Sequence, residues 1–375
     1  MDRFYFDHNA TTPVSPEVLE AFSGALAEVY GNASSIHHYG QAAKKKLEQA
    51  RREVAALLNA DPGEIVFVSG GTEADNLAVL GAVRAAGKPR KHVITTAIEH
   101  PAVLNACAQL EREGVEVSYA APDQVPRALR PETVLISVMH ANNELGTLQP
   151  VAEIARIARE AGVLMHSDGV QAAGRIPVDV RALGVDLYSI SGHKMYAPKG
   201  IGALYVRKGV KLAPLLYGGH HERDLRAGTE NVPGAVALGR AVAWARENLA
   251  TGLAALRDRL ERGILERVPD TAVNGAGAPR IPNTTNIRFD GIDGEAMAIA
   301  LDLRGFAVSS GAACSSGAVE PSHVLTAIGL TKEQARSSLR FSLGRQNDES
   351  QVDALIEAVA GAAAHLRRLS PAYHA

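Results

Sequence analysis

A lysine beside a histidine follows a short apolar run near the middle of the chain. The run covers 185–190, and Ser191-Gly192 breaks it before His193 and Lys194. An ammonium group at the end of a buried strand is poorly solvated, and this favours the neutral amine that forms a Schiff base with an aldehyde. A solvated lysine that simply begins a loop is the alternative reading, and this segment alone does not separate the two.

A glycine-rich turn follows an earlier apolar run. Ser69-Gly70-Gly71-Thr72 comes directly after 65–68 and opens a predicted helix. The glycines allow close approach of the backbone to a ligand, and the helix N-terminus with the Thr72 hydroxyl suits a phosphate. The turn has neither the spacing nor the lysine of a P-loop. A plain threonine N-cap, with Asp75 completing a capping box, is the other reading.

Polar side chains also follow three further apolar runs. His100 follows the first, Asn143 the second, and Asp168 with Gln171 the third. His100 can stack on a ligand or shuttle protons there, or it can be structural. A buried carboxylate such as Asp168 needs a cationic partner, because an unpaired buried charge is costly. A lysine, an aspartate and a phosphate-binding turn are together the three requirements of pyridoxal 5′-phosphate (PLP), which is the predicted cofactor.

A single cysteine lies among small residues late in the chain. Cys314 is surrounded by serine, glycine and alanine from 309 to 318. Such residues cannot anchor a core, so we expect an exposed, mobile loop and a reactive thiol. Cys107, among larger apolar residues, is predicted to pack inside a helix. A mobile thiol combined with PLP suggests a nucleophile that reaches a cofactor-bound substrate.

The elements that position these groups alternate between short apolar runs and amphipathic helices. This alternation predicts an α/β fold with a mostly parallel sheet flanked by helices, and a ligand site at the carboxyl ends of the strands. The apolar runs lie at 65–68, 92–96, 115–119, 133–139, 163–166, 185–190 and 202–206, and the helices between them at 72–86, 101–113 and 151–161.

Three parts of the chain are expected. Residues 1–14 form an N-terminal arm that packs with a small domain, 15–250 form the large cofactor-binding domain, and 251–375 form a small α+β domain that carries the cysteine loop at about 309–320. A helical stretch over 233–268, with a break near Thr251-Gly252, joins the two domains. The small domain is predicted to alternate strands at 286–289, 306–309 and 338–343 with helices at 294–304, 321–328 and 348–366.

Composition excludes several classes of protein. The chain has 375 residues and a formal net charge of −2, which gives no footprint for nucleic acid or an anionic membrane surface. Its two cysteines lie far apart, so a disulfide framework is not expected. The first residues lack the pattern of a signal peptide, and no apolar run has the ~20 residues that span a bilayer. We therefore expect a cytoplasmic protein.

These segments, in this order, resemble the cysteine desulfurases of the class V aminotransferase group (NifS/IscS type) over almost the full length. The motifs that carry the resemblance are DHNATTP at 7–13, SGGTEADN at 69–76, HANNELG at 140–146, DGVQ at 168–171, SGHKMYAPKGIG at 191–202, GGHHERDLRAGT at 218–229, SSGAACSS at 309–316 and RFSLGR at 340–345. The resemblance implies PLP-dependent fold type I, with a large domain and a smaller C-terminal domain.

The resemblance also implies a role for each matching residue. Lys194 holds the cofactor aldehyde, Asp168 pairs with the pyridine nitrogen, and His100 stacks on the ring and acts in acid–base steps. Thr229 is expected to reach the phosphate of the partner subunit in a homodimer. The residues implied for the phosphate within one subunit are Gly71, Thr72, Ser191, Gly192 and His193.

The substrate implied by the resemblance is L-cysteine. Arg340 is expected to hold its carboxylate, with Asn32 as a weaker helper, and Asn143 and Gln171 lie near the ring hydroxyl or the substrate. Cys314 would attack the substrate sulfur, keep it as a persulfide and release alanine. The length of the loop and the Glu320-Pro321 after it look like the long-loop class, which hands sulfur to an acceptor protein for iron–sulfur clusters, thio-cofactors or tRNA. No metal is implied.

Other functions remain open at this stage. An aminotransferase or selenocysteine lyase of the same fold would need no persulfide on Cys314. A PLP-independent thiol hydrolase would pair Cys314 with a histidine. A metal-binding module could use His37-His38 and His220-His221, although adjacent histidines point in different directions on regular structure.

Overall fold

The computed structural model describes residues 3–249, 252–310, 313–315 and 318–369, and side chains outside 311–319. The chain divides into two compact units. The large unit comprises Thr12–Ala141 and Gln149–Leu249, and the small unit comprises Met1–Thr11, Asn142–Leu148 and Ala250–Ala375. The short segment from Asn142 to Leu148 therefore leaves the large unit to join the small one, which the sequence did not indicate.

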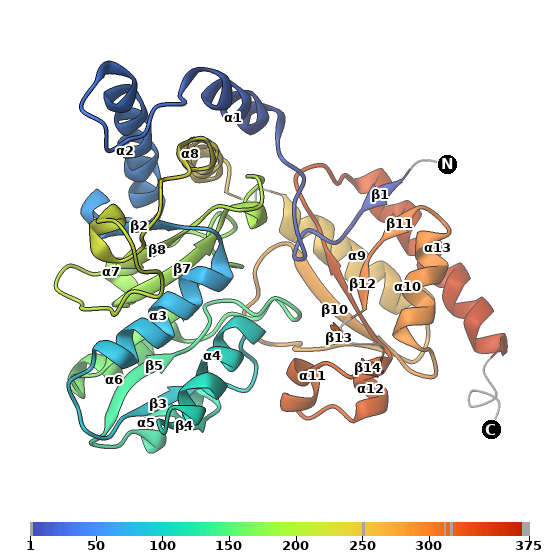
Figure 1. Cartoon of the computed structure of the whole chain (residues 1–375). Coiled ribbons are helices and arrows are strands. Elements are labelled where there is room, and N and C mark those ends of the chain that lie inside the picture. The colour runs from blue at the N-terminus through green and yellow to red at the C-terminus, as the bar shows by residue number, and fades with distance from the viewer. Residues whose placement is uncertain (1–2, 250–251, 311–312, 316–317, 370–375) are drawn as a thin grey trace. The chain divides into compact units, whose positions relative to one another are not determined.

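The centre of the large unit is a seven-stranded sheet (Figure 1). Only β8 runs against the other strands, so the expected mostly parallel sheet is confirmed. Five of its strands, β2, β3, β5, β7 and β8, are buried at every residue, which explains their mostly apolar composition. In spatial order the strands are β2 (Ile65–Val68), β8 (Gly202–Val206), β7 (Leu187–Ser191), β6 (Leu164–Asp168), β5 (Thr133–Ser137), β3 (His92–Thr95) and β4 (Glu116–Tyr119).

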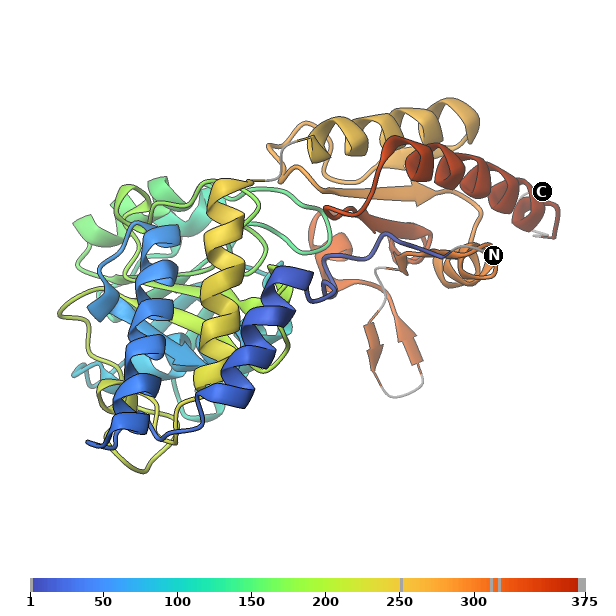
Figure 2. The same cartoon turned by 90° about the horizontal axis from the view of Figure 1, so that it is seen from above.

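Helices cover this sheet. α3 (Gly71–Ala85) lies across the strands from β5 to β8 and packs against α4 (Pro101–Arg112), as Figure 1 shows. α8 (Val232–Glu247) packs against both α1 (Pro16–Glu28) and α2 (His38–Leu58), and the three run side by side in Figure 2. The remaining helices of the unit are α5 (Val125–Ala128), α6 (Val151–Glu160) and α7 (Val180–Leu183). No described helix is long and apolar enough to cross a membrane.

The small unit is built on a four-stranded antiparallel sheet. Its order is β12 (Ser309–Ser310), β15 (Ser338–Ser342), β10 (Thr284–Phe289) and β9 (Thr271–Val273). The buried rings of Phe6, Phe289 and Phe341 belong to one core together with apolar residues of α9, α10 and α13. Those three helices are α9 (Leu253–Arg267), α10 (Gly294–Asp302) and α13 (Glu349–Leu369), and the short ones are α11 (His323–Ala327) and α12 (Lys332–Arg336).

The N-terminal arm belongs to this small unit. β1 (Phe4–Tyr5) pairs in parallel with β11 (Phe306–Ala307), and the Phe4 and Phe306 rings lie 5.4 Å apart. The single strand expected over 306–309 is in fact two, because β11 pairs with the arm whereas β12 pairs with β15. A run of apolar and small side chains does not indicate that the pairing strand changes within it.

The backbone around Cys314 differs from the expected loop. β13 (Ala313–Ser315) pairs with β14 (Ala318–Glu320) in an antiparallel hairpin, and Cys314 is opposite Val319. In Figure 2 both strands extend away from the four-stranded sheet of the same unit. Small residues do not prevent backbone pairing, and the free N–H and C=O groups of each strand satisfy the other. The expected exposure and mobility of the Cys314 side chain fall outside the described side chains.

Local caps and glycines set the ends of the helices. α2 begins at His38, where the His37 ring accepts a hydrogen bond from the Gly40 N–H. The helical stretch over 233–268 is divided into α8 and α9, as the break expected near Thr251-Gly252 requires, and Gly252 before α9 has a φ of 87°. This conformation suits glycine and breaks the helix.

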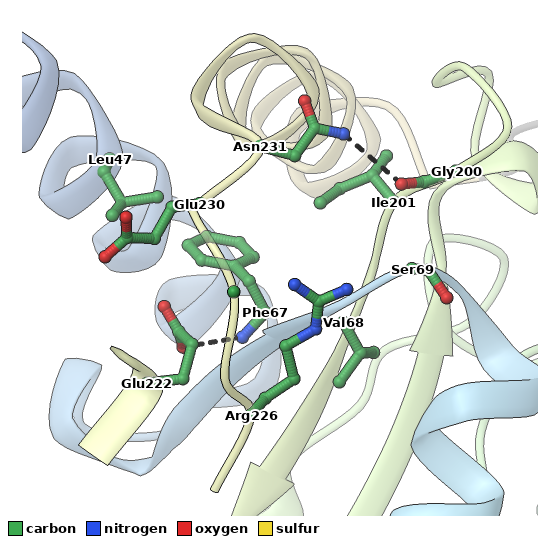
Figure 3. A pocket seen from close by; sticks show the side chains of 11 residues that line it. Leu47, Phe67, Val68, Ser69, Gly200, Ile201, Glu222, Arg226, Glu230 and Asn231 are labelled. Atoms are coloured by element: carbon green, nitrogen blue, oxygen red, sulfur yellow. Dashed lines mark hydrogen bonds between the residues drawn. The ribbon is translucent and has the colours of Figure 1, made fainter. Parts of the chain in front are cut away.

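The loop that contains Thr229 is anchored to the edge of the large sheet. β2 is an edge strand, and the Phe67 N–H donates to Glu222 at 2.8 Å, as Figure 3 shows. The same carboxylate accepts two 2.7 Å hydrogen bonds from Arg51, whose guanidinium also donates to the Ile65 carbonyl. The side chains of Glu222 and Arg51 thus satisfy backbone N–H and C=O groups at the edge of the sheet, with which another strand would otherwise pair.

This anchor holds a strained piece of backbone. Glu222, Arg223 and Asp224 have φ values of 44°, 57° and 65°, which residues other than glycine rarely adopt. Arg226, further along the loop, pairs with Glu73 at 3.0 Å, near the beginning of α3. The loop is therefore fixed to α2 and α3 by two ion pairs and to β2 by the hydrogen bond from Phe67 to Glu222.

The buried pair is expected to contribute strongly to stability. Glu222→Gln removes the counter-charge of a buried guanidinium, and we expect a loss of about 3–5 kcal/mol in the free energy of unfolding. The control is Glu48→Gln, because Glu48 pairs with the same Arg51 but its side chain is 41% exposed, against 3% for Glu222, so the loss of unfolding free energy is expected below about 1 kcal/mol. Denaturant unfolding measures both values, and equal effects would contradict the assigned anchor.

Candidate active site

The predicted cofactor residues of the large unit follow the carboxyl ends of its strands. Asp168 ends β6, Ser191 ends β7, and His100 follows β3. β6 and β7 are parallel neighbours, with Asp168 opposite Ser189. The strand pairing therefore brings Asp168 and the Ser191–Lys194 turn to one edge of the sheet, which is where an open α/β sheet binds ligands.

Asp168 is a buried carboxyl with cationic groups nearby. Burial raises its pKa, whereas His100, a hydrogen bond from the Val170 N–H and Lys194 all act in the opposite direction. The Val170 N–H donates to Oδ1 at 2.9 Å. The carboxyl is thus oriented by the backbone and can stabilise a positive charge placed against it.

Lys194 is held at the end of a short turn. The turn Gly192–Lys194 is a single 3₁₀ segment after β7, and Lys194 is half-buried rather than enclosed. The Thr12 N–H and hydroxyl both donate to the His193 carbonyl at 2.9 Å. Burial is the main cause that lowers the pKa of His193 to about 4, and the positive charges of Lys194, Lys199 and Arg175 lower it further. His193 is therefore neutral near pH 7 and offers one N–H.

The glycine-rich turn forms a cradle with Ser191. α3 begins at Gly71, so its N-cap is Gly70 and not the threonine of the alternative reading. A Cβ on Gly71 would come within 2.9 Å of Val170 and 3.4 Å of Ser191, so only glycine fits without displacement. The Ser191 hydroxyl is buried and has no hydrogen-bond partner in the described structure. An unused donor facing free helix N–H groups fits a phosphate.

Three other predicted residues have local partners. The His100 ring is exposed, and its Nδ1 accepts from the Ala102 N–H at 3.1 Å, which assigns the proton of the neutral ring to Nε2. Gln171 is buried and its side-chain oxygen accepts from Arg175. Asn32 is exposed, and its side chain accepts from the Ser34 N–H. Thr229 is exposed on the anchored loop.

Arg340 and Asn143 belong to the small unit. The Arg340 guanidinium pairs with Asp7 at 2.6 Å and donates to the Asn143 carbonyl at 3.1 Å. Its Nε is buried without a hydrogen-bond partner in the described structure. The arginine is therefore preoriented, with one donor left over for a carboxylate. The pairing of Arg340 with Asp7 spans most of the chain and gave no signal in the sequence.

Several buried polar residues near Asp168 were not anticipated. Burial raises the pKa of Glu99 to about 8 and lowers the pKa of His166 to about 3. Burial also raises the pKa of Tyr188, whose hydroxyl lies 2.8 Å from Nδ1 of His140. Asp75 was considered only as part of a capping box, yet it is fully buried. Asp75 occupies a helical position that faces the core, and a polar residue at such a position was the sequence signal that could have indicated its burial.

Histidines suggested for a metal have other partners. The His37 ring caps α2, and His220 pairs with Asp224. No cluster of three or more metal-ligating side chains occurs within the described residues.

Comparison with known proteins gives consistent matches over nearly the whole chain. The family model described as aminotransferase class-V matches residues 4–355. A protein named cysteine desulfurase from Trichormus azollae is 49% identical over 99% of this chain and 95% of its own length. One named cysteine desulfurase IscS from Methanosarcina thermophila is 47% identical over 98% of this chain and 93% of its own.

A solved structure has the same fold. A NifS-like protein is 36% identical and superposes with a TM-score of 0.90, covering 97% of this chain and all of that one. Its likeness bears out the fold class expected from the alternating runs and helices. By sequence and by structure, the chain belongs to the aminotransferase class-V family.

Proposed function

We propose that this protein is a PLP-dependent cysteine desulfurase, which converts L-cysteine to L-alanine and keeps the sulfur as a persulfide on Cys314. The observation that carries the proposal is the combination of a strand-end Asp168, Lys194 and a phosphate cradle with a cysteine on a separate hairpin. Relatives named cysteine desulfurase, at 49% and 47% identity, support the same function.

The residues of the large unit fit PLP. Asp168 would hold the protonated pyridine nitrogen, Lys194 the aldehyde, and Ser191 with the N-terminus of α3 the phosphate. The phosphate fits because the buried Ser191 hydroxyl has no partner within the described residues and a side chain at Gly71 would fill the cradle. When bound, PLP draws electrons from the substrate, which makes the bond from carbon to sulfur easier to break.

The chain's own groups would carry out sulfur transfer. The Cys314 thiolate attacks the sulfur of bound cysteine, a sulfur–sulfur bond forms and the carbon–sulfur bond breaks. The carbon receives a proton, so one cysteine and one thiol become alanine and a persulfide. The exposed His100 Nε2–H is suited to move that proton. Arg340 would hold the substrate carboxylate through the Nε–H that has no partner within the described residues. Asn143 and Gln171 are proposed to bind the ring hydroxyl or the substrate, with Asn32 as a weaker helper.

Sulfur would leave on an acceptor. A persulfide on a hairpin can be passed to the thiol of a scaffold or carrier protein, which is the class of partner we infer for iron–sulfur cluster or thio-cofactor assembly. We also infer a cytoplasmic location, because a persulfide-forming thiol requires a reducing compartment. Cell fractionation tests the location, and recovery in an oxidising compartment would contradict it.

A homodimer is supported by exposed side chains of the large unit. Ile36 and Tyr217 are 94% and 85% exposed, and Tyr30 is 70% exposed. The rings of Tyr30 and Tyr39 lie 5.3 Å apart, and exposed apolar side chains that lie together favour a protein interface. The ion-paired loop presents Thr229 at its exposed end, where it could reach the phosphate of a partner subunit.

Cys314→Ser separates the persulfide mechanism from its alternatives. We expect sulfide release from L-cysteine to fall at least ~100-fold, because an alcohol at this position cannot accept sulfur. The control is Cys107→Ser, since Cys107 is buried and burial raises its thiol pKa to about 12. Sulfide and alanine are measured with a thiol reductant present. Unchanged sulfide release from Cys314→Ser would contradict the persulfide mechanism and would favour a lyase that needs no persulfide.

The phosphate cradle is tested by Ser191→Ala. Loss of one phosphate donor is expected to weaken PLP binding by about 1.5–3 kcal/mol, with little change in unfolding stability of the apoenzyme. Ser167→Ala is the control, because the Ser167 hydroxyl is also buried without a partner in the described structure but is not part of the cradle. Equilibrium dialysis against PLP measures both, and equal affinities for the two variants would exclude Ser191 from the cradle.

The role of Thr229 across a dimer is tested by mixing two inactive variants. Thr229→Asp places a carboxylate against the phosphate, and Lys194→Ala removes the aldehyde partner. In a mixed dimer, one site combines an intact Lys194 with an intact Thr229 from the other subunit, so activity should return. Failure of co-expressed, doubly tagged dimers to regain desulfurase activity would show that Thr229 does not act across the interface.

A further inference from the structure

A chain of buried polar side chains runs beneath the Asp168 edge of the sheet. Asp75 on α3 faces Ser189 on β7, and an interaction with the Ser189 hydroxyl acts to lower the pKa of the Asp75 carboxyl. The Ser189 Oγ lies 3.0 Å from Nε2 of His166 on β6. Nδ1 of His166 lies 2.8 Å from Oγ of Ser137 on β5. All four side chains are buried, with exposed fractions of 0–1%. This row of polar side chains crosses three neighbouring strands, and it has no part in the proposed sulfur transfer.

The surroundings of Asp75 do not support a negative charge. Its Oδ1 is buried without a hydrogen-bond partner in the described structure, and Nε2 of His166 is 3.6 Å away. Burial is the largest cause of its raised pKa, Asp168 and Glu99 raise the pKa further, and the interaction with Ser189 acts in the opposite direction without offsetting them. An ionised Asp75 would be a buried charge close to the Asp168 carboxylate, which is costly.

Asp168 is buried as well, but its surroundings differ. His100, the Val170 N–H and Lys194 all favour its ionised form. One negative charge shared between the two carboxyls therefore belongs on Asp168, and the proton belongs on Asp75. Glu99, with its pKa near 8, is also protonated at neutral pH.

The position of that proton sets the direction of every hydrogen bond in the chain. Burial lowers the pKa of His166 to about 3, so its ring is neutral, with one nitrogen donating and the other accepting. If Asp75 donates to Ser189, then Ser189 donates to Nε2 and Nδ1–H donates to Ser137. If Asp75 were ionised, Ser189 would donate to it, and the ring proton would move to Nε2.

We propose that Asp75 is a positioning residue, which donates the first hydrogen bond of the chain through Ser189 and His166 to Ser137 and thereby leaves Asp168 as the one carboxylate facing the pyridine nitrogen. These hydrogen bonds between side chains would also fix the relative position of α3, β6 and β7. α3 begins at the phosphate cradle and β6 ends at Asp168, so this connection would hold both ends of the cofactor site. The part that concerns the cofactor rests on the proposed function; the proton position does not.

The tautomer of His166 in the wild-type protein decides the proton position. Histidine labelled with ¹⁵N allows two-bond ¹⁵N–¹H correlation spectra of the apoenzyme and holoenzyme, and His166→Gln identifies the signal. We expect a neutral ring with the proton on Nδ1. A proton on Nε2, or a doubly protonated ring, would overturn the proposal without bearing on desulfurase activity.

Matched substitutions at the two carboxyls extend the test. In the infrared spectrum, Asp75→Asn should remove the carbonyl band of one protonated acid that is present near pH 7, and Asp168→Asn should not. The Glu99→Gln spectrum assigns the other such band. PLP affinity should fall at least ~10-fold in Asp168→Asn. If Asp75→Asn removes no band, the proposal is wrong; an unchanged affinity of Asp168→Asn would instead contradict the proposed cofactor site.

Discussion

The site depends on one buried negative charge at the end of a parallel strand. Asp168 ends β6 inside the sheet edge, and burial alone would favour its neutral form. His100 and Lys194 oppose that effect, and both follow other strand ends of the same sheet. The sheet therefore brings a carboxylate together with the groups that favour its ionised form, at a place where water is scarce. A cationic ring nitrogen placed there gains more than it would in solvent.

The phosphate end of the site depends on a second constraint, the anchoring of α3. Its N-terminus begins at two glycines beside Ser191, and Glu73 of its first turn pairs with Arg226. Arg226 lies on the loop that Arg51 and Glu222 hold against the β2 edge. The same loop presents Thr229. The ion pairs therefore connect the edge strand, the cradle and the proposed intersubunit residue.

The sequence was most informative where chemistry follows a strand directly. The cofactor site could be predicted because the strand ends of a parallel sheet meet at one edge. The features that marked it were the glycines before a helix, Asp168 after one apolar run and Lys194 after another. Contacts between distant segments could not be read. The pairing of Arg340 with Asp7 and the alignment of His166 between Ser137 and Ser189 depend on strand register, which residue types do not specify. Small residues around Cys314 likewise predicted a loop, although the described backbone forms a hairpin.

Lys194 is the residue that we propose binds the cofactor aldehyde. Reduction of the PLP-loaded protein with borohydride fixes the bond between the cofactor and its lysine, and peptide mass spectrometry then locates it. We expect the phosphopyridoxyl mass on the peptide that contains Lys194. The same mass on another lysine, or on none, would show that Lys194 does not hold the cofactor.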